Sequence, residues 1–119
     1  MTNLASPKRG EIWLVNFDPT VGAEIKKIRP AVVVSSDGVG KLPIKLIAPI
    51  TDWKDYFAVN IWHIKIEPDS NNNLAKFSAV DVLQLRGMDV QRCITKIGEC
   101  SAETMEIIAA AIAAIVEYQ

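Results

Sequence analysis

Three cations lie within four positions of one loop, and they are the residues best placed to do chemistry. Lys26, Lys27 and Arg29 precede Pro30, which leads into the apolar run at residues 31–34. A residue before proline is restricted to extended conformations, so Arg29 enters a strand in a defined orientation while the lysines stay at the surface. A fixed guanidinium matches the geometry of a phosphate group, with lysines as flanking point charges. The pattern therefore indicates an anion-binding site.

A second interpretation is that residues 18–30 form an ordinary charged, solvated loop. Glu24 would then pair with a nearby cation, and such exposed pairs contribute only about 0–1 kcal/mol. The loop is longer than the roughly two to five residues of a simple hairpin connection, and Gly22 allows a sharp bend in it. Excess loop length is typical of functional segments. The residue pattern alone leaves both interpretations open.

Other familiar chemistries lack the residues they need. His63 is the only histidine, which excludes a mechanism in which two histidines act as acid and base, and its place in a predicted strand favours packing. The segment "SDGVGK" lacks the full spacing of a phosphate-binding loop and the hydroxyl residue that would follow Lys41. Cys93 and Cys100 form no recognisable ligand set, so we expect buried thiols, no metal and no cofactor.

Length, charge and cysteine content limit the class of protein. The 119 residues suit a single domain over residues 1–119, with residues 1–8 as a flexible lead-in. The net charge is −1, but residues 1–65 hold nine Lys/Arg against six Asp/Glu, so an anionic ligand should meet this half. The two cysteines make no disulfide framework, the N-terminus has no apolar signal segment, and no apolar run is long enough to span a membrane. These features predict a cytoplasmic protein.

Six short strands and one helix must position the cationic loop. Apolar and β-branched runs between turn-forming residues predict strands at residues 11–17, 31–35, 44–50, 60–66, 79–85 and 93–97. Ser101 is an N-cap candidate, and apolar residues at helical spacing predict a helix over residues 102–117. Consecutive strands without intervening helices favour an antiparallel sheet. We therefore expect a mainly β fold, a small SH3-like antiparallel barrel with a C-terminal amphipathic helix.

Five segments, in this order, resemble the MazF/PemK family of toxin endoribonucleases. They are "RGEIW" at residues 9–13, "DPTVGAE" at 18–24, "RPAVVV" at 29–34, "LIAPIT" at 46–51 and "VLQLRGMD" at 82–89. The resemblance covers about residues 8–117, and the order of the segments makes it specific. It implies a CcdB/MazF-type barrel that forms a homodimer. Apolar side chains on both faces of the first predicted strand are consistent with a buried interface.

The resemblance also implies an activity and a partner. Members of the family are toxins of type II toxin–antitoxin systems that cleave single-stranded RNA at short sequences without a metal. The ribose 2′-hydroxyl attacks the adjacent phosphate, leaving a 2′,3′-cyclic phosphate and a free 5′-hydroxyl. Translation and growth are then inhibited until a cognate antitoxin protein binds the toxin. None of these properties follows from composition or spacing.

The catalytic residues that the resemblance implies are Arg29 and Thr51. Arg29 falls on the family's arginine before proline, and Thr51 on the threonine that ends the third predicted strand. A fixed guanidinium complements the extra negative charge of a pentavalent phosphorane, and a threonine hydroxyl can hold a nonbridging oxygen. Because a guanidinium stays protonated, we expect electrostatic stabilisation from Arg29 rather than proton transfer. By pattern alone, Thr51 would first be interpreted as a strand-end residue bonded to its own turn.

Five further residues are candidates for RNA binding. They are Lys26, Lys27, Glu24, Gln84 and Arg86. Glu24 matches an acidic loop residue of the family and would orient the nearby cations. Gln84 would bind a base edge, although a place in a simple strand ladder is an equal alternative. Arg86 matches a family arginine, and its alternative role is an ion pair with Asp89.

The acid that some members carry before this glutamine is replaced by Leu83. Asp81, two positions earlier and expected on the same strand face, is a speculative substitute acid. The RNA sequence that is recognised should depend on the loops at residues 18–30, 36–43 and 52–59.

Two other classes of function remain open. DNA-gyrase poisons share the fold and bind without catalysis, but their activity depends on an apolar C-terminal end, whereas this chain ends in Glu117, Tyr118 and Gln119. The other alternative is an inactive barrel that only binds RNA or an antitoxin. Incubation of the protein with RNA in EDTA distinguishes both from a metal-independent endoribonuclease.

Overall fold

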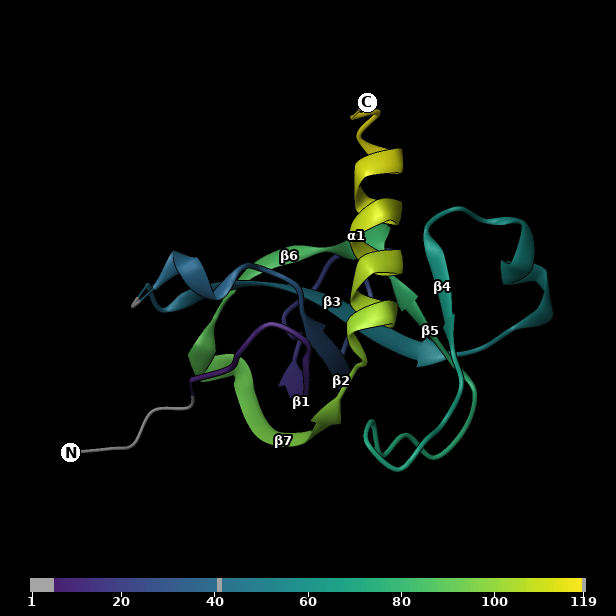
Figure 1. The fold of residues 1–119 in the computed structure, drawn as a ribbon. Coiled ribbons are helices and arrows are strands. Elements are labelled where there is room, and N and C mark those ends of the chain that lie inside the picture. The colour runs from purple at the N-terminus through teal and green to yellow at the C-terminus, as the bar shows by residue number, and fades with distance from the viewer. Residues whose placement is uncertain (1–5, 41, 119) are drawn as a thin grey trace.

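The computed structural model describes residues 6–40 and 42–118. It contains an antiparallel sheet followed by one α-helix, with four short 3-10 helices in the connections. The strands are β1 (Glu11–Asn16), β2 (Ile28–Val33), β3 (Ile44–Asp52), β4 (His63–Ile66), β5 (Ser78–Asp81), β6 (Arg86–Asp89) and β7 (Cys93–Glu99), and the helix is α1 (Ala102–Ile115). Figure 1 shows α1 lying across the sheet, with its C-terminal end extending beyond the strands.

β3 organises the sheet because it pairs with three other strands in turn. The strand order is β4-β5-β3-β2-β1-β7, and β6 pairs with β3 outside this path. Residues 44–47 of β3 pair with β6, residues 47–49 with β2, and residues 50–52 with β5. Among the described strands, β4 and β7 end the path without pairing to each other, so the sheet is bent but open. The predicted mainly β fold with a C-terminal helix is confirmed.

Two apolar clusters lie on opposite faces of the sheet. The cluster between the sheet and α1 contains Ile12, Val32, Ala48, Ile50, Ile66, Val80, Val82, Met105, Ile108 and Ala111. The cluster on the other face contains Val15, Phe17, Ala31, Ile47, Met88 and Cys93. β1 contributes to both clusters, as the apolar residues on both of its faces predict.

α1 closes one face of the sheet, and its N-terminus is capped as predicted. Ser101 Oγ accepts a hydrogen bond from the Thr104 amide at 3.0 Å, which satisfies one of the free donors of the first turn. Met105, Ile108 and Ala111 recur at helical spacing and are buried against the sheet. The helix ends at Ile115, two residues before the predicted end.

The predicted strands are present, but several differ in their bounds, and one further strand, β6, occurs. The strand predicted at residues 79–85 ends at Asp81, where the chain enters a 3-10 helix, Val82–Gln84. The Asp81 carboxylate accepts from the Leu83 amide at 3.1 Å and so caps this turn. β6 was not predicted, because its residues show no apolar alternation. β2 begins at Ile28 rather than at residue 31, and the fourth strand begins at His63 rather than at residue 60.

The predicted lead-in at residues 1–8 lies mostly outside the described residues. Within the described part, Pro7 is buried, and the Lys8 amide donates to the Glu11 carboxylate at 2.9 Å. Residues 7 and 8 therefore pack onto the fold. No helix within residues 6–40 and 42–118 is long and apolar enough to cross a membrane.

Candidate active site

Strand pairing brings the candidate catalytic residues to one face of the sheet. The β2–β3 ladder ends at the pair Ala31–Pro49, and Arg29 and Thr51 each lie two positions beyond it, at the same end. On its other side, Thr51 lies directly opposite Ala79 of β5. Because side chains alternate along strands, Arg29 and Thr51 share the face of Ala31. The register therefore supports a site built from neighbouring strands.

Arg29 is half-buried at the start of β2, opposite Val15 of β1. Its Nε donates to the carbonyl oxygen of Lys26 at 3.0 Å, which orients the guanidinium plane. Among the described residues, its two terminal nitrogens donate to no protein atom. A guanidinium that is held at one edge and free at the other can bind two phosphate oxygens.

Thr51 lies near the end of β3 and is partly exposed. In the part of the chain that the structure describes, its hydroxyl has no hydrogen-bond partner. The alternative in which Thr51 bonds to its own turn is therefore not observed. A free hydroxyl on the same face as Arg29 is available to a phosphate oxygen.

The loop between β1 and β2 is closed at its base by two hydrogen bonds, one between backbone groups and one to the Asp18 side chain. The Phe17 amide donates to the Lys27 carbonyl oxygen at 2.9 Å, and the Lys27 amide donates to Asp18 Oδ1 at 3.0 Å. Lys27 has a φ of 72°, a left-handed conformation that turns the chain into β2. Lys26 and Lys27 are exposed, and neither forms an ion pair with another described residue. Both lysines are surface charges, as predicted.

Glu24 contacts its own turn rather than a cation. Its Oε1 accepts from the Val21 amide at 2.8 Å. Within residues 6–40 and 42–118 it forms no ion pair, so the alternative of a local ion pair is wrong, whereas an orienting role for Glu24 stays a prediction. The reason is local: the carboxylate of a residue three positions after a free amide reaches that amide within the same turn.

Two arginines, Arg86 at the start of β6 and Arg92 at the end of the 3-10 helix that follows it, hold the start of this loop. Arg86 Nη1 donates to the Phe17 carbonyl oxygen at 3.3 Å. Arg92 Nη1 donates to the carbonyl oxygens of Asn16 and Asp18 at 3.0 and 2.6 Å. No sequence pattern selects Arg92, because these contacts join residues more than 70 positions apart. Both arginines fix backbone at the base of the loop and concentrate positive charge there.

The alternative ion pair between Arg86 and Asp89 is not formed among the described residues. Asp89 Oδ1 instead accepts from the Gln91 amide at 2.8 Å and caps the next 3-10 turn. Arg86 is directed at the Phe17 carbonyl oxygen, on the side of the β1–β2 loop.

Gln84 connects the turn after β5 to the β1–β2 loop. Its Oε1 accepts from the Ile25 amide at 2.6 Å, and its Nε2 donates to Asp81 Oδ2 at 3.3 Å. The alternative that places Gln84 in a strand ladder is wrong, because the residue lies in a 3-10 helix. Its carboxamide oxygen bonds protein backbone in this structure, so binding of a base edge stays a prediction.

Asp81 lies in the sheet and not at the surface. It is 6% exposed, whereas Leu83 is 61% exposed, because the chain leaves the strand between them. The prediction that both share one strand face is therefore wrong. Burial also makes direct contact between the Asp81 carboxylate and a large RNA substrate unfavourable, which argues against its use as a substitute catalytic acid.

His63 packs beside Asp81, as its place in a strand predicts. Its Nε2 lies 3.7 Å from Asp81 Oδ2, and its ring stacks on Phe57 with the centroids 3.7 Å apart. Nδ1 faces the carboxamide nitrogen of Asn60 at 3.1 Å, so Nδ1 is the acceptor and Nε2 carries the proton. Burial lowers the pKa of His63, and the Asp81 carboxylate partly opposes this shift. Neutral His63 is thus a packed residue.

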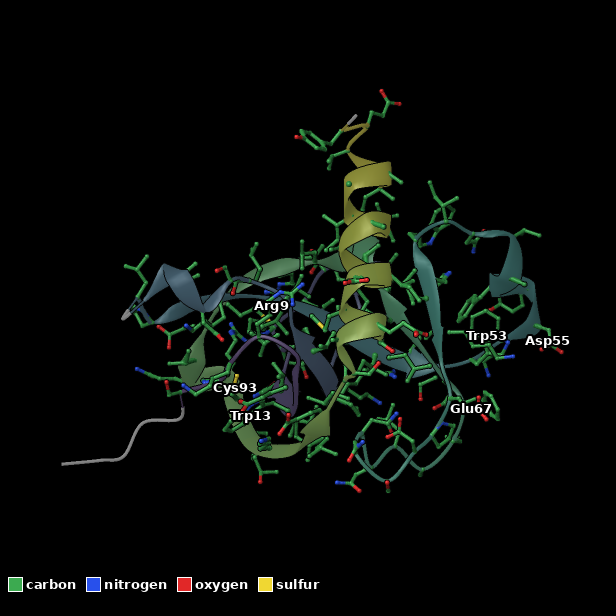
Figure 2. All side chains as sticks on the ribbon, viewed as in Figure 1. Arg9, Trp13, Trp53, Asp55, Glu67 and Cys93 are labelled. Carbon is green, nitrogen blue, oxygen red and sulfur yellow. The ribbon has the colours of Figure 1, made fainter. Side chains whose placement is uncertain are left out.

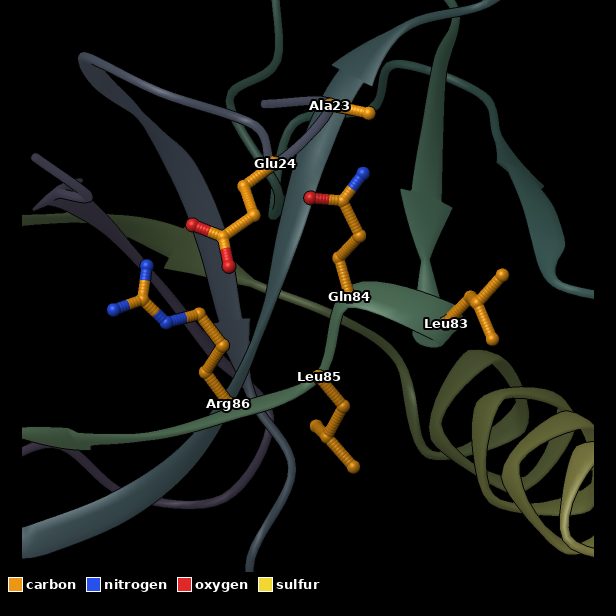
Figure 3. A pocket seen from close by; sticks show the side chains of 6 residues that line it. All are labelled: Ala23, Glu24, Leu83, Gln84, Leu85 and Arg86. Carbon is orange, nitrogen blue, oxygen red and sulfur yellow. The ribbon is translucent and has the colours of Figure 1, made fainter. Parts of the chain in front are cut away.

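A pocket of roughly 370 Å³ lies between the β1–β2 loop and the turn after β5. It is lined by Ala23, Glu24, Leu83, Gln84, Leu85 and Arg86. Figure 3 shows the Gln84 carboxamide directed toward Ala23 and Glu24, with the Glu24 carboxylate and the Arg86 guanidinium extending to the same side. Neither Arg29 nor Thr51 lines the pocket, so the pocket is separate from the candidate catalytic pair.

Lys65 is a further cation on the face of Thr51. It lies opposite Ala79, which pairs with Thr51 on the other side. Its Nζ lies 5.0 Å from the ring centroids of both Trp53 and Phe77. Figure 2 shows Trp53 on the β4 side of the molecule, well separated from Cys93 at the start of β7. Strand alternation from a known register would have found Lys65, but the sequence does not supply the register.

The thiols and acids do not form a metal site in the part of the chain that is described. No group of three or more His, Cys, Asp or Glu residues is arranged to hold a metal ion within residues 6–40 and 42–118. Burial raises the pKa of Cys93 and of Cys100 to about 11, with a smaller effect of a nearby aspartate in each case. Both thiols therefore stay protonated at neutral pH.

Comparison with known proteins shows which family the chain resembles. The family model "PemK-like, MazF-like toxin of type II toxin-antitoxin system" matches residues 8–116. The endoribonuclease toxin ChpB of Escherichia coli K12 is 31% identical over 112 residues, which cover 92% of this chain and 94% of the relative. Endoribonuclease MazF9 of Mycobacterium tuberculosis is 30% identical, with 80% and 83% covered.

Solved structures share the fold over nearly the whole chain. MazF from Deinococcus radiodurans has a TM-score of 0.76 at 20% identity, covering 98% of this chain and 99% of that one. An endoribonuclease in complex with its cognate antitoxin, from a mycobacterial species, has a TM-score of 0.75 at 16% identity, with 96% and 98% covered. At these identities the structures establish the fold alone.

The family match and the relatives at about 30% identity establish the class. The chain belongs to the PemK-like, MazF-like toxins of type II toxin–antitoxin systems.

Proposed function

We propose that this toxin is an endoribonuclease that cleaves single-stranded RNA without a metal. Relatives that match most of its length carry the name endoribonuclease. The single observation that carries the proposal here is Arg29, which is oriented by Lys26 and has its outer guanidinium edge free of described protein atoms. Thr51 lies on the same face as Arg29, and its hydroxyl is a second donor for the same phosphate.

The reaction we propose begins with attack of a ribose 2′-oxygen on the adjacent phosphorus. The phosphorane that forms carries more negative charge than the starting phosphodiester, and the free edge of Arg29 is complementary to that charge. The Thr51 hydroxyl donates to a nonbridging oxygen. The attacking 2′-hydroxyl gives its proton to solvent. Breakage of the bond from phosphorus to the 5′-oxygen then leaves a 2′,3′-cyclic phosphate, and the departing 5′-oxygen takes a proton from solvent to become a 5′-hydroxyl.

Lys26, Lys27 and Arg86 would attract the RNA backbone to this face. The pocket lined by Leu83 and Gln84 would bind a neighbouring group of the RNA.

Cleavage of messenger RNA in the cytoplasm would inhibit translation and growth. A solved structural neighbour is a complex with its cognate antitoxin, and we propose such a protein partner for this chain too. An acidic and apolar antitoxin segment would compete with RNA for the cationic loop. We further propose a homodimer of one-domain chains.

Arg29→Ala tests the site. The purified protein is incubated with a long RNA in EDTA, and fragments are sequenced to map the cleaved ends. Wild type should cut at short defined sequences, and Arg29→Ala should lower the rate by at least about a hundredfold, since removal of one transition-state donor costs about that much. Lys26→Ala, from the same loop, is the matched control and should retain most of the activity.

Circular dichroism should show that Arg29→Ala remains folded. Absence of wild-type cleavage at any sequence would contradict the enzyme and favour a binding toxin. Normal cleavage by Arg29→Ala would show that the catalytic site lies elsewhere.

A further inference from the structure

A buried carboxylate lies outside the Arg29–Thr51 pair. Asp81 is 6% exposed and accepts hydrogen bonds from the Leu83 amide at 3.1 Å and from Gln84 Nε2 at 3.3 Å, with His63 Nε2 at 3.7 Å. Burying a carboxylate is costly unless its oxygens are satisfied. Such a group is therefore expected to fix the orientation of the side chains around it.

Asp81 determines which way the Gln84 carboxamide faces. The carboxamide nitrogen donates to Asp81 Oδ2, and this leaves the oxygen to accept from the Ile25 amide at 2.6 Å. If the carboxamide were turned over, its oxygen would face the carboxylate and its nitrogen would face an N–H group. Both contacts would be lost, so the carboxylate selects the orientation that binds the loop.

The contact at Ile25 leads directly to Arg29. Ile25 precedes Lys26, whose carbonyl oxygen accepts from Arg29 Nε at 3.0 Å. The carbonyl that orients the guanidinium therefore belongs to the residue that follows the one whose amide Gln84 holds, one peptide unit away. The described contacts run without interruption from Asp81 through Gln84 and the 25–26 backbone to Arg29.

We propose that Asp81 is a positioning residue that sets the orientation of Arg29 through Gln84 and the backbone of residues 25–26. This inference rests on the proposed RNA cleavage for its kinetic consequences, but not for its structural ones. Asp81 does not touch RNA in this arrangement. Without it, the loop would sample other positions and Arg29 would meet the phosphate in the productive orientation less often.

Three variants test the contact by exchanging its chemistry. Asp81→Asn keeps the size of the side chain, but its amide group faces the amide of Gln84. Gln84→Glu still accepts from Ile25, but its carboxylate faces the carboxylate of Asp81. The double variant restores a donor opposite an acceptor, because an asparagine amide at 81 can donate to a glutamate at 84 while the other glutamate oxygen accepts from Ile25.

The kinetic readout is kcat and KM for cleavage of an RNA oligonucleotide in EDTA. Each single variant should lower kcat by about tenfold or more, the effect of one charge-assisted hydrogen bond, with a smaller change in KM. The double variant should return kcat to within about threefold of wild type, since the two changes compensate. His63→Gln removes the other partner of Asp81 without touching Gln84 and should leave kcat nearly unchanged.

The structural readout is hydrogen exchange of the Ile25 amide in the RNA-free protein. The amide should be protected in wild type and in the double variant, and should exchange faster in both single variants. Amides of the core strands, such as Val32 and Val80, should exchange equally slowly in all four proteins, which excludes a general loss of stability.

Two results would overturn the inference. One is unchanged Ile25 exchange in both single variants, and the other is a double variant no more active than the weaker single variant. If wild type fails to cleave RNA in EDTA, the proposed function is wrong, and Ile25 exchange still decides whether Asp81 positions the loop.

Discussion

At the scale of single residues, the three cations at and just before the start of β2 have different tasks. Arg29 is half-buried in a strand and oriented by a backbone carbonyl, whereas Lys26 and Lys27 are exposed. The proline rule predicts this division, because Pro30 places Arg29 in extended backbone. The assignment of Thr51 as its partner comes from resemblance, since a strand-end threonine has no pattern of its own. The contacts of Arg92 and Lys65 depend on register and could not be predicted.

The lysines should contribute to RNA affinity through charge alone. Lys26→Gln and Lys27→Gln should each make the negative slope of log K against log salt less steep by about 0.7, the value for one phosphate contact with a single strand. Binding is measured by fluorescence anisotropy with a 2′-deoxy oligonucleotide, which lacks the attacking hydroxyl and so is not cut. Lys96→Gln is the control, because Lys96 already pairs with Glu11 and Glu99 at 3.3 and 2.9 Å. An unchanged slope in both loop variants would show that these lysines do not meet phosphates.

At the scale of elements, the chain is predictable where local pattern and tertiary contact agree. The apolar alternation of β1 and the capped, periodic α1 are such cases. The segment after Asp81 is not, because "VLQLR" has the composition of a strand but forms a 3-10 turn followed by β6. The buried Asp81 carboxylate caps that turn, and its burial depends on β4 and β5 being paired. No local rule contains that information.

β7 depends on a glycine at the point where the loop after β4 approaches it. A β-carbon added at Gly98 would lie 2.5 Å from the Asn71 carbonyl oxygen and 2.6 Å from that of Asn72, and both are backbone atoms that cannot move alone. Gly98→Ala should therefore reduce the free energy of unfolding by about 1–3 kcal/mol, as overpacking usually does. Urea unfolding, with the slope unchanged, measures the effect.

The control for this change is another strand glycine. A β-carbon at Gly87 in β6 would lie 3.5 Å from Ile44 Cγ2, an ordinary contact. Gly87→Ala should leave the urea midpoint unchanged or raise it slightly, because alanine has less backbone entropy to lose. Equal urea midpoints for the two variants would show that the loop at Asn71 and Asn72 shifts at little cost to accommodate a β-carbon at residue 98.

At the scale of the whole molecule, two groups make stability depend on pH in separate windows. Burial lowers the pKa of His63 below its ordinary value of 6.5. Burial alone would raise the pKa of Glu11, but hydrogen bonds from the Lys8 amide, Trp13 and Lys96 outweigh it and lower the pKa below 4.5. In both cases the unfolded chain takes up a proton at higher pH than the folded protein does. Stability is therefore lost as the pH falls, first through the histidine and later through the glutamate.

The histidine window gives the clearest test, because His63 is the only histidine in the chain. Wild type should have a smaller free energy of unfolding at pH 5.5 than at pH 7.5, measured by urea titration, since protonation of the unfolded chain begins near pH 6.5 and the folded ring resists it. His63→Gln keeps a polar side chain but cannot titrate, so its free energy of unfolding should change much less over the same interval. An equal loss in the two proteins would assign the pH dependence to other groups. A gain for wild type on acidification would mean that the attraction of Asp81, 3.7 Å away, outweighs burial.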